Sequence, residues 1–457
     1  MYEQYLEIID QKAQQICAVS DHIWEHPETS FKEYEAVRVL KAALEENGFT
    51  VTTNVAGIPT SFTATYGQGA PHLGVLAEYD CVNGISQVGC IAEQKNIEGL
   101  RQGHGCGHNL FAGGSLAAVL AMKAYIDDTG KGSVTLFGCP AEEGGAGKVY
   151  MVRDGVFKDV EAIVSWHPES MYMVRTRPAL ANVGVVYAFD GIAAHAGAAP
   201  HKGRSALDAV ELMNIGVNFL REHMDLSSRI HYAITDPGGS APNMVQAHAE
   251  VDYLIRAEDA EAVRELRARV DRIAQGAAMM TDTKVTIHTY KGYSNLITIP
   301  TLQATANEAM HDIPLPEPTE EDIAYGRALQ ESMSLTKAQQ AMPPYAMKVL
   351  DPAPPVPHGG STDTADVSWN CPTVQMHIGN WVVGTPGHSW QSTSQSRGSY
   401  AKRAMLYASK AVAGTVLRLM EDPAAVEQAK QEHAQRVGAG YVCPLPDGLE
   451  PELVPMP

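Results

Sequence analysis

Two short apolar runs, LGVLA at residues 73–77 and VTLF at residues 134–137, enclose the helical stretch SLAAVLAMKAYI at residues 115–126. The runs have the length of buried strands, and the stretch between them has the length of a helix. A third run, AIVSW at residues 162–166, continues the alternation. Strands that alternate with helices form largely parallel sheets. We therefore predict a mixed, largely parallel α/β domain around these segments.

The pattern changes near residue 180, where alternating strands and amphipathic helices follow each other in a compact stretch. The residues at 248–255, HAEVDYLI, alternate with period two, as a half-exposed antiparallel strand does. Apolar residues within 259–276 are spaced three and four apart, which predicts a helix. We predict an inserted βαββαβ (ferredoxin-like) domain at residues 181–292, and an α/β domain formed by residues 1–180 and 293–457.

Composition and charge limit the possible functions. The chain has 457 residues, too many for one ordinary core, so we expect two or more domains. The formal net charge is −19, whereas proteins that bind nucleic acids or anionic membranes carry basic faces. We expect no nucleic acid and no membrane as a partner. The chain begins without an apolar signal segment and its seven cysteines are scattered, which predicts a cytoplasmic protein without a disulfide framework.

Residues 103–109, GHGCGHN, place three potential metal ligands close together. His104, Cys106 and His108 stand at alternate positions, and the glycines between them favour a tight loop. A thiolate and an imidazole two residues apart can face one ion. Taken alone, the segment is equally typical of a glycine-rich turn with an incidental buried cysteine.

Three further segments carry candidate ligands. PAEE at residues 140–143 follows the run VTLF, and α/β proteins place active sites at the carboxyl ends of such strands. Of its two carboxylates, Glu142 and Glu143, one can bind a metal while the other stays free as a base. His167 also ends an apolar run, and His388 lies in a loop rich in glycine and proline. Each segment alone is also typical of a solvated turn or a buried histidine.

The combination is more informative than any one segment. Candidate ligands follow successive strands of one α/β domain, and another comes from the C-terminal half. A mixture of thiolate, imidazole and carboxylate suits zinc or manganese. Five ligands are more than one tetrahedral ion needs, so we predict a bridged pair of divalent ions, Mn or Zn.

Together, the motifs HGCGHN, PAEE, WHP and GHS resemble those of the aminoacylase and carboxypeptidase family of co-catalytic metallo-amidohydrolases. The cysteine is similar to that of a subgroup with plant auxin-conjugate hydrolases and bacterial N-acyl-amino-acid hydrolases. GGSTDTADVSW at residues 359–369, followed by VGTPGHSW at 383–390, resembles a bacterial branch that uses aminobenzoyl-glutamate. The resemblance covers nearly the whole chain, including WEHPETSFKE at residues 24–33.

The resemblance implies a role for each of five metal ligands. Cys106 would bridge the two ions. Glu143 and His388 would complete the coordination of one ion, and His108 and His167 that of the other. Each ion would then have two ligands of its own and share the thiolate.

The resemblance also implies roles for residues beside the metals. Glu142 would be the general base that takes a proton from water and later gives it to the leaving amine. Asp80 would support the metal centre, although a strand-end turn residue explains it equally well. We expect structural roles for His104 and Asp363. Asn109 departs from many relatives, which have an acidic residue there, and puts the substrate pocket in doubt rather than the metal centre.

The inserted domain would act as a lid and a dimerisation domain. His195 matches the family's histidine that donates to the oxyanion, often across a dimer interface. Asn243 matches a substrate-binding asparagine, and Arg256 matches the arginine that holds a substrate carboxylate. Gly359 and Gly360 could offer backbone N–H groups to that carboxylate.

The resemblance implies hydrolysis of N-acyl or N-aroyl amino acids, with p-aminobenzoyl-glutamate as the leading candidate and dipeptides or other acyl-amino acids as alternatives. A hydrolase that uses Cys106 as its nucleophile is a second hypothesis, but the number of candidate ligands argues against it. A non-catalytic subunit is a third, and the free carboxylate of Glu142 argues against it. We expect a homodimer, or an assembly with a homologous second subunit.

Overall fold

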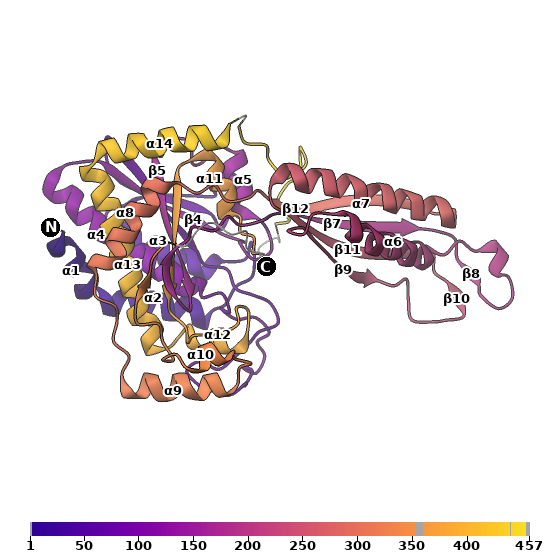
Figure 1. Cartoon of the computed structure of the whole chain (residues 1–457), viewed down its shortest axis with the longest axis horizontal. Helices are drawn as coiled ribbons and strands as arrows, with labels where there is room; N and C mark the ends of the chain where they lie inside the picture. Colours follow the sequence, from indigo (N-terminus) through magenta and orange to yellow (C-terminus); the bar gives the residue numbers. More distant parts are fainter. Residues whose placement is uncertain (1, 353–359, 439, 454–457) are drawn as a thin grey trace.

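The computed structural model describes residues 2–352, 360–438 and 440–453. Figure 1 shows a large layered body and an elongated second body on its right. Each body has its own core of buried apolar side chains. The fold class predicted from the sequence, a largely parallel α/β body with an inserted βαββαβ unit, is confirmed.

The large body contains an eight-stranded sheet in the order β1-β2-β4-β3-β5-β14-β6-β13. Its central strands β4, β3, β5 and β14 are parallel, and β1 and β2 pair with their neighbours in antiparallel fashion. Strand β6 is antiparallel to β14 and parallel to β13. The strands are β1 (Thr50–Thr53), β2 (Phe62–Gly67), β3 (His72–Glu78), β4 (Ser133–Cys139), β5 (Ala162–Glu169), β6 (Tyr172–Val174), β13 (Val349–Leu350) and β14 (Thr373–Gly379).

Helices cover the large sheet, and most residues of the long helix α4 are buried. It contacts β3, β4, β5 and the long helix α13. By length and composition α4 could cross a membrane, but 89% of that apolar window is buried inside the protein. The helices are α1 (Glu3–Gln11), α2 (Ala13–Glu25), α3 (Tyr34–Glu46), α4 (His108–Thr129), α5 (Gly147–Arg153), α8 (Pro300–Asp312), α9 (Glu320–Glu331), α10 (Lys337–Gln340), α11 (Thr364–Asn370), α12 (Trp390–Gln395), α13 (Ser399–Glu421) and α14 (Pro423–Val437).

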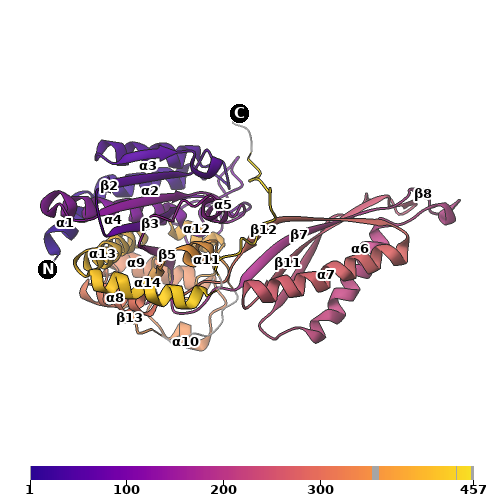
Figure 2. The same ribbon diagram turned by 90° about the horizontal axis from the view of Figure 1, so that it is seen from above.

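The second body is an antiparallel sheet in the order β12-β7-β11-β9, with two helices packed on one face (Figure 2). A small ribbon of β8 and β10 lies at its far end (Figure 1). The elements are β7 (Ala181–Asp190), β8 (Ala194–His195), α6 (Ala206–Leu220), β9 (Arg229–Asp236), β10 (Met244–Val245), β11 (His248–Ala257), α7 (Ala260–Thr281) and β12 (Lys284–Tyr293). Division of the chain at residues 181 and 292 stays a prediction.

Candidate active site

The loop before α4 places Cys106 and His108 at the carboxyl ends of the central strands. Gly107 has φ 74°, and a Cβ atom there would lie 3.0 Å from Pro168 and from Trp381. Only glycine adopts this turn at low cost, so the loop depends on it. The Nδ1 atom of His108 lies 3.0 Å from Oδ1 of Asp80, which leaves Nε2 directed at the site. The supporting role of Asp80 stays a prediction, and this contact is the geometry that such a role requires.

The turn after β4 carries both adjacent glutamates. Its residue Ala141 has φ 60°, and the Ala141 N–H donates to the buried carboxyl of Glu33 over 2.9 Å. The Glu143 N–H donates to Oδ2 of Asp80 over 2.9 Å. The hydroxyl of Tyr293 donates to the carbonyl oxygen of Glu142 over 3.1 Å. These bonds fix the turn and let the two carboxylates diverge.

The two remaining predicted ligands approach from β5 and from the loop before α12. The Nδ1 atom of His167 is hydrogen-bonded to the carbonyl oxygen of Pro168 over 2.8 Å, and its Nε2 atom lies 3.4 Å from Sγ of Cys106. The Nε2 atom of His388 lies 3.2 Å from Oε2 of Glu143. All five predicted ligands therefore converge on one place, although they come from four separate segments.

The described residues contain three groups whose ligand atoms all lie within 4.8 Å of one another. Two of them reproduce the predicted sets and share the thiolate. The groups are Cys106–His108–His167, Cys106–Glu143–His388 and Glu78–His108–Glu142. The third group includes Glu78, which the sequence analysis did not single out.

Orphaned polar atoms support the fit of metal ions to these groups. Within the described ranges, His108 Nε2, Glu78 Oε2 and Glu143 Oε1 are buried without a hydrogen-bond partner. Such atoms are costly in a folded protein unless another partner satisfies them. Because all three atoms belong to the candidate groups, divalent cations fit the site.

The crowding of carboxylates perturbs their pKa values in opposite directions. Burial raises the pKa of Glu142 well above its usual range, and the charges of Glu78 and Glu143 raise it further. Burial also opposes ionisation of Glu143, but the hydrogen bond from His388 and the charge of His108 lower its pKa to about 2. The two neighbours thus differ in their affinity for a proton.

A cavity of about 600 Å³ connects this site with the second body. Cys106, Glu142 and His388 line one side of it, and Arg256 on β11 and Gly360 line another. The cavity has three further basic side chains and an apolar wall that the sequence analysis missed. These side chains are Arg175, Arg177, Lys291, Met171, Met173, Leu254 and Leu350. Because they lie in β6, β11, β12, β13 and loops, no sequence motif marks them.

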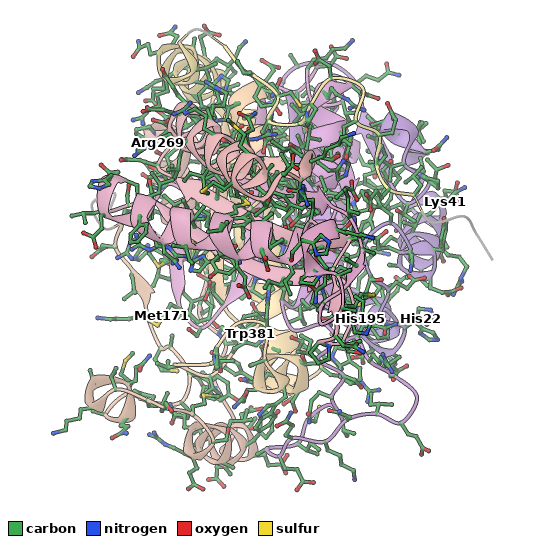
Figure 3. All side chains as sticks on the ribbon, turned by 90° about the vertical axis from the view of Figure 1, so that its right-hand side faces the viewer. His22, Lys41, Met171, His195, Arg269 and Trp381 are labelled. Atoms are coloured by element: carbon green, nitrogen blue, oxygen red, sulfur yellow. The ribbon has the colours of Figure 1, made fainter. Side chains whose placement is uncertain are left out.

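His195 and Asn243 do not line this cavity. His195 is exposed on β8, at the end of the second body that faces the viewer in Figure 3. Asn243 is exposed beside it, and its carbonyl accepts from the Ala196 N–H over 2.9 Å. Nδ1 of His195 accepts from two backbone N–H groups, each at 3.2 Å, so Nε2 carries the proton and can donate. Within one chain these two residues remain apart from the other site residues.

His104, for which the sequence predicts a structural role, and Asn109 are both buried among hydrogen bonds. Nε2 of His104 lies 3.0 Å from the Ile23 carbonyl, and burial lowers the pKa of His104 to about 3. The Asn109 amide donates to the Ser396 carbonyl over 2.9 Å, so this departure from the relatives lies away from the cavity lining. Gly359 is outside the described residues.

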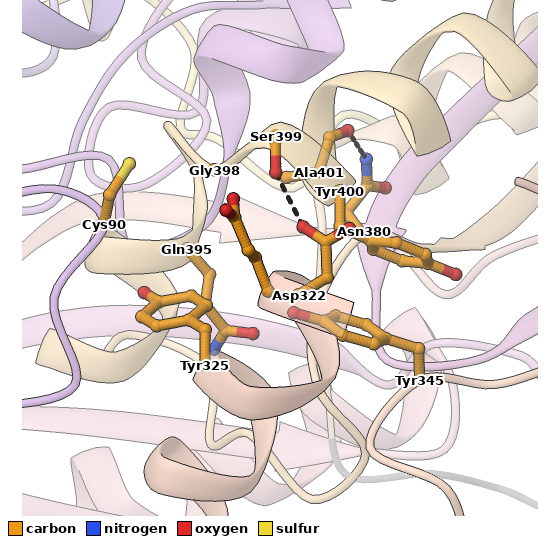
Figure 4. A pocket seen from close by; sticks show the side chains of 11 residues that line it. Cys90, Asp322, Tyr325, Tyr345, Asn380, Gln395, Gly398, Ser399, Tyr400 and Ala401 are labelled. Atoms are coloured by element: carbon orange, nitrogen blue, oxygen red, sulfur yellow. Dashed lines mark hydrogen bonds between the residues drawn. The ribbon is translucent and has the colours of Figure 1, made fainter. Parts of the chain in front are cut away.

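A second cavity, of about 250 Å³, lies beside α9 and the start of α13 (Figure 4). Tyr325, Tyr345 and Asp322 are among its lining residues. The buried Asp322 is paired with Arg403 and hydrogen-bonded to Ser399. None of the candidate metal-ligand groups of the described residues contributes to this cavity.

Known proteins share both the sequence and the fold. The chain is 41% identical to one of the subunits of the p-aminobenzoyl-glutamate hydrolase of Escherichia coli, with 97% of each covered. It is 27% identical to the mouse Xaa-Arg dipeptidase, over 93% of this chain and 90% of that one. Among solved structures, an aminobenzoyl-glutamate utilization protein of Klebsiella pneumoniae superposes with a TM-score of 0.64 at 17% identity, covering 90% of this chain and 97% of the other.

A dinuclear metal-binding peptidase of the M20 family from Bacillus subtilis has the same fold, with a TM-score of 0.58, 17% identity, and coverage of 90% and 99%. The family described as peptidase family M20/M25/M40 matches residues 75–392, which include all five predicted metal ligands. This chain therefore belongs to the peptidase family M20/M25/M40.

Proposed function

We propose that the protein is a metal-dependent amidohydrolase that cleaves the amide bond of N-aroyl or N-acyl amino acids, with p-aminobenzoyl-glutamate as its substrate. One observation carries this proposal: a single cavity joins the clustered ligand atoms and Glu142 to a wall with Arg256 and other cations. An amide bond with a carboxylate nearby fits such a cavity. The similarity to the Escherichia coli hydrolase supports the choice of substrate.

Cys106 would hold both metal ions through its thiolate, with Glu143 and His388 completing one site and His108 and His167 the other. Their ligand atoms form two groups that share this sulfur. When bound, two divalent ions, Mn or Zn, polarise the scissile carbonyl and make water a stronger nucleophile. Asp80 keeps Nε2 of His108 directed at the site by occupying Nδ1.

Glu142 would act as the base. Its carboxylate lies in the same cavity, and its backbone is held by Tyr293. It would take a proton from the attacking water and deliver it to the nitrogen of the leaving amine, which departs as the free amino acid.

The amino-acid half would bind through its charges. Arg256 would pair with the α-carboxylate, because a planar guanidinium donates two parallel hydrogen bonds to a carboxylate. Lys291 and Arg177 add positive charge for the side-chain carboxylate of glutamate. The N–H of Gly360 can contribute as well. An arginine side chain, as in an Xaa-Arg dipeptide, would meet repulsion from these groups.

The aromatic acyl half would bind against apolar side chains. Four residues of the cavity suit a flat ring, and they are Met171, Met173, Leu254 and Leu350. Thioethers make favourable contacts with aromatic rings and adapt to their shape. A p-aminobenzoyl group would thus lie on the apolar wall while the glutamate faces the cations.

A second chain would complete the site. His195 lies on β8 and Asn243 directly precedes β10, at the far end of the second body (Figure 1), and neither lines the cavity of its own chain. We infer that they serve the cavity of a partner, where His195 donates to the oxyanion. The edge strand β9 and exposed apolar residues near it, Phe219 and Leu226, suit a dimer interface. The partner is a second copy or a homologous subunit, and the assembly would act in the cytoplasm.

Glu142→Gln tests the catalytic assignment. The variant should bind metal as the wild type does, while its turnover of p-aminobenzoyl-glutamate falls by about 10²-fold or more, because the amide cannot accept the proton. Glu321→Gln, in the other cavity, is the matched control. Retained turnover in Glu142→Gln would exclude the base. If the wild type contains no transition metal or hydrolyses neither this substrate nor other acyl-amino acids, the proposed function is wrong.

Mixing inactive variants tests the shared site. His195→Ala and Glu142→Gln chains should each be inactive alone. A homodimer that reassembles from an equal mixture should recover about a quarter of the wild-type activity, because half of the dimers contain one intact site of two. Activity that stays absent after confirmed exchange of chains would show that His195 does not act across an interface.

A further inference from the structure

Three charged side chains form a buried network behind the metal-ligand cluster. Lys148 on α5 is fully buried, and its Nζ lies 2.6 Å from Oε1 of Glu78 and 2.7 Å from Oδ1 of Asp363. Glu78 ends β3 and is 1% exposed, and Asp363 precedes α11 and is 0% exposed. The Lys148 N–H also donates to Oδ2 of Asp363 over 2.9 Å.

The charges of this network do not balance. One ammonium faces two carboxylates, so balance of the second negative charge depends on the imidazole of His108, or on a cation beside it, 3.1 Å from Oε2 of Glu78. A buried charge without compensation costs several kcal/mol. The imbalance falls on Glu78, because both oxygens of Asp363 accept from Lys148, whereas Oε2 of Glu78 is among the buried atoms without a hydrogen-bond partner.

The free oxygen of Glu78 is directed at a candidate metal ligand. It lies 3.1 Å from Nε2 of His108, and neither atom is hydrogen-bonded within the described part of the chain. Two ligand atoms at right angles, each about 2.1 Å from one ion, are about 3.0 Å apart. The other candidate pairs have similar separations, 3.2 Å for Glu143 with His388 and 3.4 Å for Cys106 with His167.

We propose that Glu78 is a further ligand of the ion bound by His108, and that Lys148 and Asp363 orient it. Lys148 occupies Oε1, so Glu78 offers one oxygen only. An added carboxylate gives the ion one more oxygen ligand and raises its coordination number above four. Both changes favour manganese over zinc. This inference rests on the two-metal site of the proposed function.

Metal binding by Glu78→Gln tests the inference without relying on activity. The substitution keeps the size of the side chain and leaves Lys148 balanced by Asp363, so the fold should persist. Metal-free protein is titrated with Mn²⁺, and free Mn²⁺ is followed by electron paramagnetic resonance. The wild type should bind two ions per chain. In Glu78→Gln the weaker of the two sites should bind Mn²⁺ with an affinity at least about tenfold lower than that of the weaker site in the wild type.

Asp322→Asn is the matched control, because Asp322 is also a buried carboxylate paired with a basic side chain, Arg403, but lies in the second cavity (Figure 4). Its Mn²⁺ titration should equal that of the wild type. Two sites of unchanged affinity in Glu78→Gln would overturn the inference and leave the proposed function intact. A wild type that binds no metal would instead overturn the proposed function.

A measurement on the wild type covers the case in which the variant does not fold. In a crystal structure of the Mn²⁺-loaded protein, Oε2 of Glu78 should lie within about 2.4 Å of the ion next to His108. A separation above about 3 Å would overturn the inference, because Glu78 would then only neutralise charge nearby.

Discussion

Arg177 offers a direct test of how the cavity would select glutamate. It lies between β6 and β7 and lines the cavity, and its Nε is buried without a hydrogen-bond partner among the described residues. Its neighbour Arg175 is already held by Gln375, through a hydrogen bond of 2.7 Å. Arg177 is therefore the better placed of the two to pair with a substrate carboxylate, and Arg177→Gln removes the charge without emptying the space.

The expected effect follows from the strength of a charge-assisted hydrogen bond. Such a hydrogen bond contributes about 1.5–3 kcal/mol. Without it, the substrate carboxylate in the cavity would have lost its hydration and gained no partner in exchange. With about 1.4 kcal/mol for each factor of ten, kcat/KM for p-aminobenzoyl-glutamate should fall by about 10- to 150-fold. Substrates without a second carboxylate, such as p-aminobenzoyl-glutamine, should lose little.

The assay compares kcat/KM for the two substrates in wild type and variant, by following release of p-aminobenzoate. Arg204→Gln serves as a control, because Arg204 is paired with Asp282 on the second body, away from the cavity. An equal loss for both substrates, or no loss for either, would refute the assignment of Arg177 to the glutamate side chain.

Three further outcomes can be measured. Arg256→Ala should raise KM for carboxylate-bearing substrates by about tenfold or more with less change in kcat, and an unchanged KM would remove its role as a clamp. Removal of metal by a chelator should lower the unfolding temperature, since the buried carboxylates lose their cations, and an unchanged temperature would contradict this. Burial raises the pKa of Asp366 from 3.8 to about 7, against the hydrogen bonds from Ser294 and Tyr441. The folded state therefore holds this proton more tightly than the unfolded state, and wild-type stability should fall by up to about 4 kcal/mol as pH rises from about 4 to about 7. Asp366→Asn lacks this proton, so chemical denaturation at several pH values should give a shallower decline in the variant, and parallel curves would refute the shift.

Local patterns were sufficient for the fold class. The run at residues 73–77 became the buried centre of β3, and the apolar stretch at 115–126 lies within α4, because strand and helix periods are properties of neighbouring residues. The predicted helix at 259–276 is the body of α7, which extends from Ala260 to Thr281. The short ribbon of β8 and β10 escaped prediction, since two-residue strands leave no period to detect.

The candidate ligands could be proposed from the sequence because their motifs occur together along one α/β domain and resemble those of a known family, although each motif alone was ambiguous. Tertiary structure added what no local pattern contains. Glu78 ends β3 directly after an apolar run, and its ion pair with Lys148 forms only when α5 packs against that strand end. Likewise Arg177 and Lys291 are more than 100 residues apart in the sequence yet line the same cavity.

The sequence by itself determined the α/β class, the motifs and the residue types able to hold two metals, since these depend on short-range spacing. Only the tertiary structure decided which atoms face one another: the shared sulfur of Cys106, the unpartnered oxygen of Glu78, and the separation of His195 from its own cavity. The physical reason is that ligand geometry, burial and charge balance depend on contacts between segments far apart in the chain, and those contacts form only when the layers pack.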